Sequence, residues 1–256
     1  LLTVVIPSYN VEKFLNQTLD SFVCDEAVMK KFEVIVVDDG SKDNTAKIGK
    51  EYADKYPDTF RVISKENGGH GSTINCGIRN AVGKYFKVVD GDDWVNTADF
   101  VKLVEDLEKT ESEYVFTNYN EYYDDVNRQK AVDFPQFKDG TEYDFADVAN
   151  KVYIPMHALV IKTSVLKDNN IVIDEKCFYV DVEYVMFPVP FVNKVTFFDL
   201  HVYMYRLALS TQSVSILGFQ KHINDHLRVT FHMFDFYRDY ISSDKADSAK
   251  ADYMRT

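Results

Sequence analysis

Cysteine is scarce in this 256-residue chain, with only three residues and no Cys-x-x-Cys pair. An odd number of widely spaced cysteines excludes a disulfide framework and argues against a structural zinc site. We therefore expect the protein to work in a reducing compartment, the cytoplasm. The three residues are Cys24, Cys76 and Cys177.

Long apolar runs are missing as well. No stretch approaches the roughly 20 apolar residues that a membrane-spanning helix needs, and no signal peptide is recognisable. The chain begins in an apolar run without an initiating methionine, and it ends in the polar stretch 242–256. We expect the natural chain to have been trimmed at its front, with 242–256 as a second cut edge.

Positive charge is in deficit. The 29 Lys and Arg residues face 41 Asp and Glu residues, which gives a formal net charge of −12. Nucleic-acid binding depends on neutralising phosphates, so we expect no nucleic-acid partner. Broad adsorption to anionic lipid is also disfavoured, whereas peripheral membrane association through a local basic patch stays open.

The first half of the chain alternates strand and helix patterns. Continuous apolar runs, typical of strands buried on both faces, alternate with apolar residues at helical spacing. Repeated units of this kind predict an α/β fold with a mostly parallel sheet and flanking helices. The predicted strands are 2–6, 32–37, 60–64 and 85–89, and the predicted helices are 11–23, 44–56, a segment ending near 81, and one around 100–107.

The second half is less regular. The polar and charged stretch 124–143 predicts a long loop, and the aromatic-rich stretch 219–240 predicts one long helix. The other predicted elements are strands at 113–123, 156–161, 195–198 and 202–206, and a short helix at 163–169.

Polar clusters follow three of the predicted strands, at 7–10, 38–41 and 90–93. Ligands of open α/β sheets bind beyond the carboxyl ends of the strands. The glycine-rich turn 68–71 precedes a helix, so its backbone N–H groups could receive an anionic phosphate. Together these features predict a nucleotide site.

The cluster Asp90-Gly91-Asp92-Asp93 places three carboxylates within four residues. Such charges repel one another unless a cation holds them, and hard oxygen ligands favour Mg²⁺ or Mn²⁺ shared with substrate phosphates. The alternative is a helix N-cap whose acidic groups complement the helix dipole. The other two strand-end clusters favour the metal site.

Other residues are ambiguous when taken alone. Asp39 could form only a turn, or it could accept a hydrogen bond from a nucleotide base. Tyr9 could stack on that base or be an ordinary half-buried tyrosine. Asp181 and Glu183 lie among aromatic and apolar neighbours, where desolvation raises the basicity of a carboxylate, but a short exposed helix would fit them equally.

In this order and combination, the clusters resemble the inverting glycosyltransferases of family 2, of bacterial type, with the GT-A fold and its DxD motif. The similarity is dense over residues 1–110. The segment 179–184 resembles the family's "ED" segment, with Val180 in place of the usual Glu. Tyr205-Arg206 followed by Gln212-Ser213 resembles a late motif near the donor pyrophosphate. Ile74 stands where the family often has an Arg, which makes Arg206 a candidate for that phosphate contact.

The resemblance implies a hexosyltransferase that moves a sugar from a nucleoside-diphosphate donor, UDP-linked, to an acceptor hydroxyl with inversion. Mn²⁺ or Mg²⁺ would be its cofactor. Asp92 would ligate the metal and Asp181 would be the catalytic base, with Glu183 as the rival base. The residues implied to bind the nucleotide are Pro7, Tyr9, Asp39, Asn67, Asp90, Arg206 and Ser213.

The resemblance also implies a division of labour along the chain. Residues 1–110 would bind the nucleotide sugar, residues 111–218 would form the acceptor-side half, and residues 219–256 a C-terminal helical extension. The acceptor would be a glycan, a lipid-linked molecule or a polymer in cell-surface polysaccharide or glycoconjugate synthesis. The location would be the cytoplasm, with the inner face of the membrane as an option, and the oligomeric state is not predicted.

Other function classes compete with this one. A sugar nucleotidyltransferase would need a loop rich in glycine and basic residues after the first strand, and residues 8–13 have none. A non-catalytic module that only holds nucleotide or glycan would be expected to lose the DxD motif or the base, and both are present.

Overall fold

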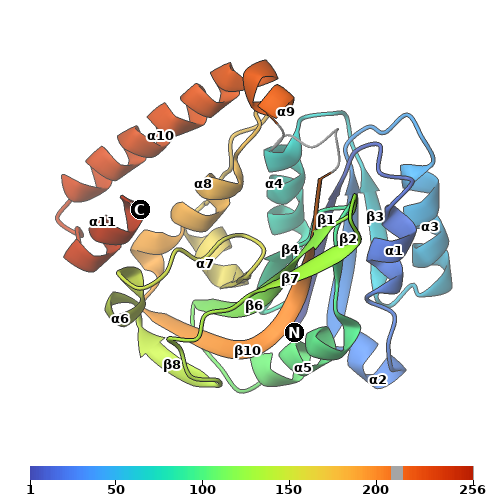
Figure 1. The fold of residues 1–256 in the computed structure, drawn as a ribbon, viewed down its shortest axis with the longest axis horizontal. Coiled ribbons are helices and arrows are strands. Elements are labelled where there is room, and N and C mark those ends of the chain that lie inside the picture. The colour runs from blue at the N-terminus through green and yellow to red at the C-terminus, as the bar shows by residue number, and fades with distance from the viewer. Residues whose placement is uncertain (209–215, 256) are drawn as a thin grey trace.

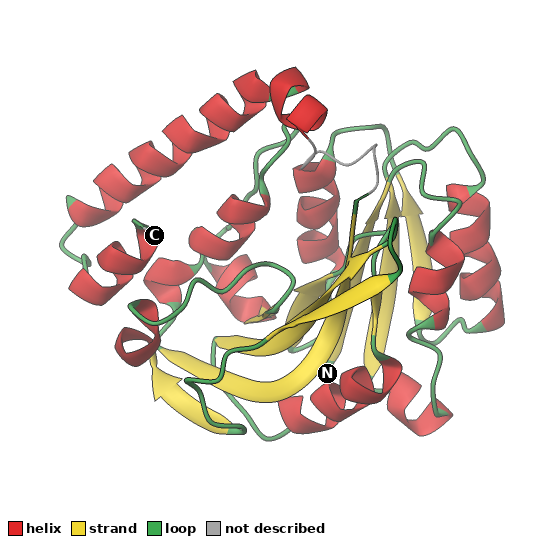
Figure 2. Ribbon diagram, in the orientation of Figure 1, coloured by secondary structure: helices red, strands yellow, loops and turns green. Residues whose placement is uncertain are grey.

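The structure, a computed structural model, describes residues 1–208 and 216–255. Figure 1 shows one curled sheet with helices packed on both of its faces, and Figure 2 separates the two element types by colour. The strands are β1 (Leu2–Ser8), β2 (Phe32–Asp38), β3 (Phe60–Ser64), β4 (Tyr85–Val88), β5 (Trp94–Val95), β6 (Tyr114–Tyr123), β7 (Arg128–Val132), β8 (Thr141–Asp144), β9 (Leu159–Lys162) and β10 (Lys194–Leu207).

The helices pack against two apolar layers, one on each face of the sheet. α1, α3 and α5 bury their apolar residues in one layer, whereas α4, α7 and α8 contribute to the other. The helices are α1 (Leu15–Asp20), α2 (Glu26–Met29), α3 (Thr45–Lys55), α4 (His70–Asn80), α5 (Thr97–Leu107), α6 (Phe145–Ala149), α7 (Thr163–Asp168), α8 (Asp181–Met186), the 3₁₀ turn η1 (Val189–Phe191), α9 (Ile216–Lys221), α10 (Ile223–Ile241) and α11 (Ser248–Met254).

The described strands form one sheet in the order β3-β2-β1-β4-β9-β6-β10-β5, with β7 beside β6 and β8 beside β10. The part from β3 to β4 is parallel, as the alternating pattern predicts. From β9 onward the sheet is mixed, because β9 runs antiparallel to both β4 and β6. The α/β fold with a sheet and flanking helices is therefore confirmed, and the parallel arrangement is concentrated in the first half.

α5 shows how the local sequence sets an element of this fold. The side chain of Asn96 accepts hydrogen bonds from the backbone N–H groups of Ala98 and Asp99, at 3.1 and 3.2 Å, and so caps the helix start. Phe100 and Leu103 then recur at helical spacing and are fully buried against the sheet. This packing places the segment after β4 at the edge of the site described below.

The prediction of a loop at 124–143 was wrong. This stretch contains β7, which pairs with β6, and the start of β8, which pairs with β10. β7 is exposed almost throughout, so its residues carry no apolar alternation that could predict a strand. Its backbone hydrogen bonds to β6 stabilise it instead.

Two further predictions needed correction. The expected strands 195–198 and 202–206 are one strand, β10, with irregular register between Phe198 and Tyr203. Such a β-bulge bends a strand without ending it. The expected helix 219–240 is divided into α9 and α10 at His222, and α11 follows in the polar stretch 242–256, where no helix was predicted.

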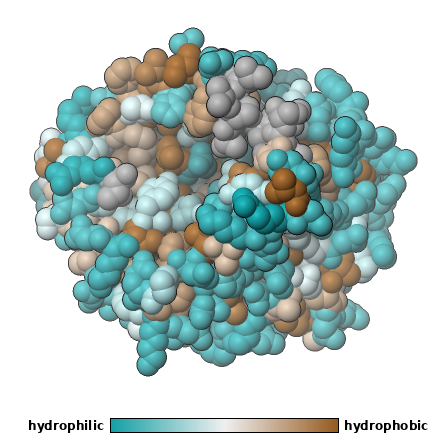
Figure 3. All heavy atoms as spheres, in the orientation of Figure 1, coloured by the Kyte–Doolittle hydropathy of each residue, from teal (hydrophilic) through white to brown (hydrophobic). Residues whose placement is uncertain are grey.

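The surface is mostly hydrophilic on the face shown in Figure 3, with apolar side chains gathered along its upper edge over α10. Among the described residues, no helix has the length and apolarity that crossing a membrane requires.

α4 packs closely against the loop that leads to α8. The side-chain amide of Asn75 donates to the carbonyl of Ile173 at 2.8 Å, and its oxygen accepts from the N–H of Ile173 at 2.9 Å. One turn earlier, a Cβ at Gly71 would lie 2.0 Å from the carbonyl oxygen of Asp174. Glycine at position 71 therefore permits a backbone contact that no other residue allows.

We expect Gly71→Ala to lower the free energy of unfolding by about 1–3 kcal/mol, because the added methyl group forces backbone apart. Gly49→Ala in α3 is the matched control, since its methyl group would meet only side-chain atoms of Val62 and Val36, at 3.0 and 3.2 Å. Urea denaturation measures both variants. An equal loss in the two would show that the loop after α7 does not depend on Gly71.

Candidate active site

A cavity of about 640 Å³ opens beyond the carboxyl ends of β1 and β4. This volume is within the usual range for a small-molecule site. One side is built from the end of β1 and the acidic turn 90–93, and the opposite side from the segment 178–182. The predicted site residues that line it are Pro7, Tyr9, Asp90, Asp92 and Asp181.

The acidic turn is fixed to the end of β1. The N–H of Gly91 donates to the carbonyl of Pro7 at 3.1 Å, and a Cβ at position 91 would lie 2.9 Å from that oxygen. The hydroxyl of Thr18, on α1, donates to the carbonyls of Asp93 and Gly91 at 2.6 and 3.0 Å. Glycine is thus required for the close approach, and the turn is held from two sides.

Asp93 is buried and accepts hydrogen bonds that stabilise the turn. Its carboxylate accepts from the backbone N–H of Arg206 at 2.7 Å and from the hydroxyl of Tyr203. Burial raises its pKa well above the ordinary value, and the neighbouring charges of Asp92 and Asp90 add to this. Asp93 therefore joins the turn to β10.

Asp90 has a partner that the sequence did not indicate. Nε2 of His70, the first residue of α4, lies 2.8 Å from its carboxylate. Burial disfavours both charged forms, yet the attraction outweighs it, so the pKa of His70 is raised and that of Asp90 is lowered. The two groups therefore form an ion pair within the cavity wall.

Asp92 is the carboxylate of the turn that has no side-chain hydrogen bond or ion pair among the described residues. Desolvation, followed by the charge of Asp90, raises its pKa to about 6, against the opposing charges of Arg206 and His70. Asp92 also lines the cavity. A carboxylate in this setting fits a hard divalent cation, which would neutralise it and lower its pKa.

Asp181 and Glu183 point to different places, as the helical spacing of α8 requires. Asp181 lines the cavity, and burial raises its pKa against the opposing charge of His70. Glu183 is fully buried outside the cavity wall, and it accepts the N–H of Asp174 at 2.8 Å. Asp181 is therefore the carboxylate that faces the cavity.

The expected phosphate site at the glycine-rich turn 68–71 is filled by the protein itself. The carboxylate of Asp39 accepts the N–H groups of Gly68 and Gly69, at 2.9 and 2.8 Å, and an ammonium contact from Lys65 at 2.6 Å. The N–H groups of Gly68 and Gly69 therefore have an anionic partner within the chain, and phosphate binding at this turn stays a prediction that would require Asp39 to be displaced.

Three of the residues expected to bind nucleotide do not line the cavity. Asp39 is buried beside the glycine-rich turn, and the exposed Asn67 donates to the carbonyl of Asp39 at 2.9 Å. Arg206 lies behind the acidic turn, where its Nε donates to the carbonyl of Asp92 at 2.8 Å and its guanidinium pairs with Asp124. The remaining residue, Ser213, lies outside the described residues, as does Gln212.

A sequence model described as "Glycosyl transferase family 2" matches residues 3–169. The chain belongs to glycosyl transferase family 2. The match ends before α8, so it covers the acidic turn and His70 but not Asp181.

Curated relatives of this family 2 chain match its first half. The "Uncharacterized glycosyltransferase EpsJ" of Bacillus subtilis is 38% identical over 115 residues, which are 45% of this chain and 33% of the relative. The "Minor teichoic acid biosynthesis protein GgaB" of the same organism is 33% identical over 111 residues, which are 43% of this chain and 12% of that protein. The chain thus spans a third or less of the length of these relatives.

Solved structures share the fold over nearly the whole chain. TarS residues 1–349 from S. aureus, in complex with UDP-GlcNAc, has a TM-score of 0.73 and 22% identity and covers 99% of this chain and 70% of that one. The mannosyltransferase PcManGT from Pyrobaculum calidifontis, in complex with GDP-Man and Mn²⁺, has a TM-score of 0.64 and 18% identity, covering 99% and 68%. The GT-A fold predicted from the sequence is confirmed.

Two further residues of this family 2 site were not identified as functional from the sequence. His157 lines the cavity and stacks on Tyr205 with ring centroids 4.0 Å apart. Burial lowers the pKa of His157 to about 4, so its ring is neutral. Beneath it, the ammonium of Lys87 donates to the carbonyl of His157 at 2.9 Å, and burial lowers the pKa of Lys87 to about 7. No sequence spacing links these residues to the acidic turn.

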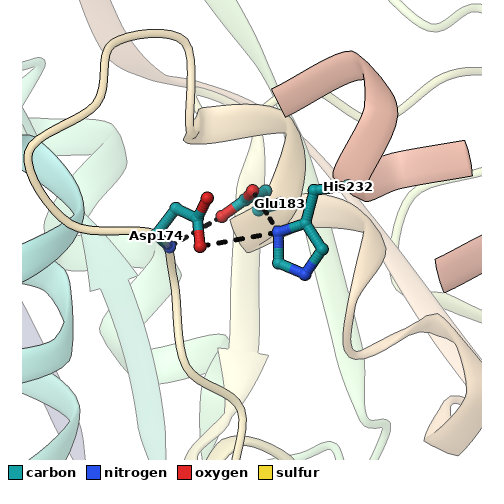
Figure 4. A group of neighbouring side chains, drawn as sticks. All are labelled: Asp174, Glu183 and His232. Atoms are coloured by element: carbon teal, nitrogen blue, oxygen red, sulfur yellow. Dashed lines mark hydrogen bonds and ion pairs between the residues drawn. The ribbon is translucent and has the colours of Figure 1, made fainter. Parts of the chain in front are cut away.

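A second group of side chains lies behind the segment that carries Asp181. Figure 4 shows Asp174, Glu183 and His232 converging from the loop after α7, from α8 and from α10. Nδ1 of His232 lies 3.0 Å from Glu183 and 3.5 Å from Asp174, and Arg228 pairs with Asp174 at 3.0 Å. These residue types could ligate a metal, but they are paired with one another here, so the group joins α10 to α8.

We expect His232→Ala to lower the free energy of unfolding by about 1–3 kcal/mol, because Glu183 is fully buried and would lose a partner. His201→Ala is the matched control. His201 pairs at 2.6 Å with Asp133, whose side chain is 54% exposed, so its loss should cost about 1 kcal/mol or less. Chemical denaturation measures the free energy of unfolding of both variants. An equal loss in the two would show that the contact between His232 and Glu183 does not stabilise the fold.

Proposed function

We propose that the chain is the catalytic domain of a metal-dependent, inverting glycosyltransferase that uses a UDP-linked sugar and acts on an acceptor hydroxyl. The single observation that carries this proposal is the cavity, which is lined by the end of β1 and by the half-buried carboxylates of Asp92 and Asp181. Membership of family 2 supports the class of reaction, and the UDP-GlcNAc bound to TarS and the GDP-Man and Mn²⁺ bound to PcManGT support a nucleotide-sugar donor and a divalent cation.

The nucleotide is proposed to lie at the end of β1. Tyr9 is 49% exposed beside the cavity and offers an aromatic face on which a base can stack, with Pro7 next to it. Asp90, held by His70, is proposed to contact the ribose. Asp39 and Asn67 are proposed to act on the base only if the glycine-rich turn rearranges, because Asp39 is engaged with Gly68 and Gly69.

Asp92 is proposed to hold the cation, Mn²⁺ or Mg²⁺. The raised pKa of this buried carboxylate and its oxygen donors fit such an ion. When bound, the cation would supply positive charge against the charge that develops on the leaving diphosphate. Arg206 supports the turn from behind through the carbonyl of Asp92, so we propose an indirect role for it in phosphate binding.

Asp181 is proposed to be the general base. It would take the proton from the acceptor hydroxyl as that oxygen attacks the anomeric carbon, while the nucleoside diphosphate leaves from the opposite face. Burial raises the pKa of Asp181, which makes its carboxylate a stronger base than an exposed aspartate. Glu183 is committed to His232 and Asp174. This geometry supports Asp181 over Glu183.

We further propose the division of labour that the sequence suggested. Residues 1–110 carry the donor side and residues 111–218 carry the base, while residues 219–256 form a helical extension over the acceptor side. The acceptor is proposed to be a glycan, lipid-linked molecule or polymer of the cell surface, a proposal supported by the similarity to the teichoic acid biosynthesis protein GgaB. The reaction is proposed to take place in the cytoplasm or at the inner face of the membrane.

The donor site is tested by calorimetry with UDP and GDP in the presence of Mn²⁺. We expect UDP to bind more tightly than GDP, and we expect Asp92→Asn to abolish the Mn²⁺-dependent part of UDP binding while the fold is retained. Asp106→Asn is the control, because Asp106 is also buried but is paired with Lys102 and Lys109 away from the cavity. Tighter binding of GDP, or unchanged Mn²⁺ dependence in Asp92→Asn, would contradict the assignment.

The base is tested by comparing Asp181→Asn with Glu183→Gln. Asp181→Asn should lower turnover by about 10²–10⁴-fold with near-normal UDP binding, because the base acts on the acceptor. Since the base acts deprotonated and its pKa is raised, the wild-type rate should fall with acidification at a pH above the ordinary pKa of an aspartate. If Asp181→Asn is active while a folded Glu183→Gln is inactive, the base is Glu183. If proton NMR shows a product with retained anomeric configuration, the proposed single-displacement mechanism is contradicted.

A further inference from the structure

Another cavity, of about 560 Å³, lies between α8 and the C-terminal helices α10 and α11. Its walls are mostly apolar and aromatic, with Val182 on one side and Met233, Phe234 and Tyr237 on the other. Val229 is almost fully buried within it. Such a surface suits an aliphatic chain, and the polar side chains of His226, Thr230 and Arg255 also line it.

This groove adjoins the donor cavity and shares a wall with it. Tyr179, Val182 and His226 line both of them. Tyr179 has a φ of 64°, in the left-handed region that a bulky residue rarely adopts. Its ring stacks on Phe219 with centroids 5.1 Å apart and an interplanar angle of 2°. The strained backbone thus holds an aromatic ring at the junction, two residues before Asp181.

We propose that the groove binds the aliphatic carrier of an amphipathic acceptor, a saccharide linked to a hydrocarbon chain, with the reactive hydroxyl at Asp181. This inference rests on the proposed function, and it chooses the lipid-linked class among the acceptors named above. The chain enters between Tyr179 and Val182 and lies along α10. The donor sugar and the carrier therefore approach Asp181 from two sides.

The far end of the groove opens onto an apolar surface. Phe234, which lines the groove, is 64% exposed. Other exposed apolar residues continue from it along α10, and Figure 3 shows apolar side chains gathered over this helix. They are Ile223, Leu227 and Phe231. A carrier longer than the groove can thus continue along these apolar side chains of α10.

The charges favour a single acceptor molecule over a lipid bilayer as the occupant. α10 carries Asp225, Asp235 and Asp239 against Arg228 and Arg238, and the whole chain has a net charge of −12. The helix therefore has no excess of Lys and Arg, on which recruitment to an anionic membrane surface depends. One uncharged aliphatic chain held in a groove needs no such excess.

The test uses octyl β-D-glucoside below its micelle-forming concentration, with glucose as the reference ligand, in calorimetry on the 256-residue chain. We expect the octyl glucoside to bind at least about a hundredfold more tightly than glucose, because each buried methylene group is favourable. Phe234→Ser should weaken that binding about tenfold. Phe231→Ser is the matched control, because Phe231 is equally exposed, at 64%, but does not line the groove.

A tenfold loss in Phe234→Ser beside unchanged binding in Phe231→Ser supports the proposal. Equal loss in both variants, or none in either, overturns it, because the ligand would then adsorb to the helix surface or bind elsewhere. If Phe234→Ser does not fold, Tyr237→Ser tests the same wall. The proposal is also overturned if light scattering shows a dimer in the wild type that is lost in both Phe variants, because a second copy of the chain would then cover α10.

Binding of UDP with Mn²⁺ is measured in the same samples to separate this inference from the proposed function. A chain that binds UDP but gains nothing from the octyl group contradicts the groove and leaves the donor site standing. A chain that does not bind UDP contradicts the proposed function itself. Loss of binding to phosphatidylglycerol vesicles in both Phe variants, without octyl glucoside binding in the wild type, would assign α10 to a membrane and overturn the groove.

Discussion

The structure depends on keeping three carboxylates together at the end of β4. Each carboxylate has a different environment: Asp90 forms an ion pair with His70, Asp93 accepts hydrogen bonds from β10, and Asp92 has a pKa raised by desolvation. Breaking any of these arrangements would leave unpaired charge in a buried setting, which is costly. Segments from β1, α1, α4 and β10 therefore meet at this turn because its charge must be satisfied.

The hydrogen bonds that β10 donates to Asp93 account for the irregular register of this strand. The strand must pair with β6 over its length and still bring Tyr203 and the backbone of Arg206 to Asp93. The irregular register after Phe198 provides that change of direction. Arg206 then fills the space behind the turn, where its guanidinium lies 4.7 Å from the Trp94 ring centroid. A residue expected to bind phosphate is in this way part of the support for the metal site.

The sequence predicts local patterns well and long-range partners poorly. Apolar runs predicted β1 to β4, and the strand-end clusters predicted the cavity, because parallel strands end at one edge. The role of His70 was not predicted because its partner Asp90 lies 20 residues away. The contact of Asp39 with the glycine-rich turn was not predicted either, because the turn pattern alone suggests a phosphate ligand. The choice between Asp181 and Glu183 depends on His232, which is 49 residues from Glu183. Tertiary contacts of this kind cannot be predicted from the spacing of residues along the sequence.

α4 begins with His70, which contacts Asp90, and one and a half turns later presents Asn75, which holds the loop before α8. At a rise of about 1.5 Å per residue, a single rigid rod of roughly 7–8 Å sets the offset between the acidic turn and the approach to Asp181. A displacement of the acidic turn would therefore be passed along α4 to the loop that leads to α8, so the spacing between the proposed donor side and the proposed base depends on this one helix.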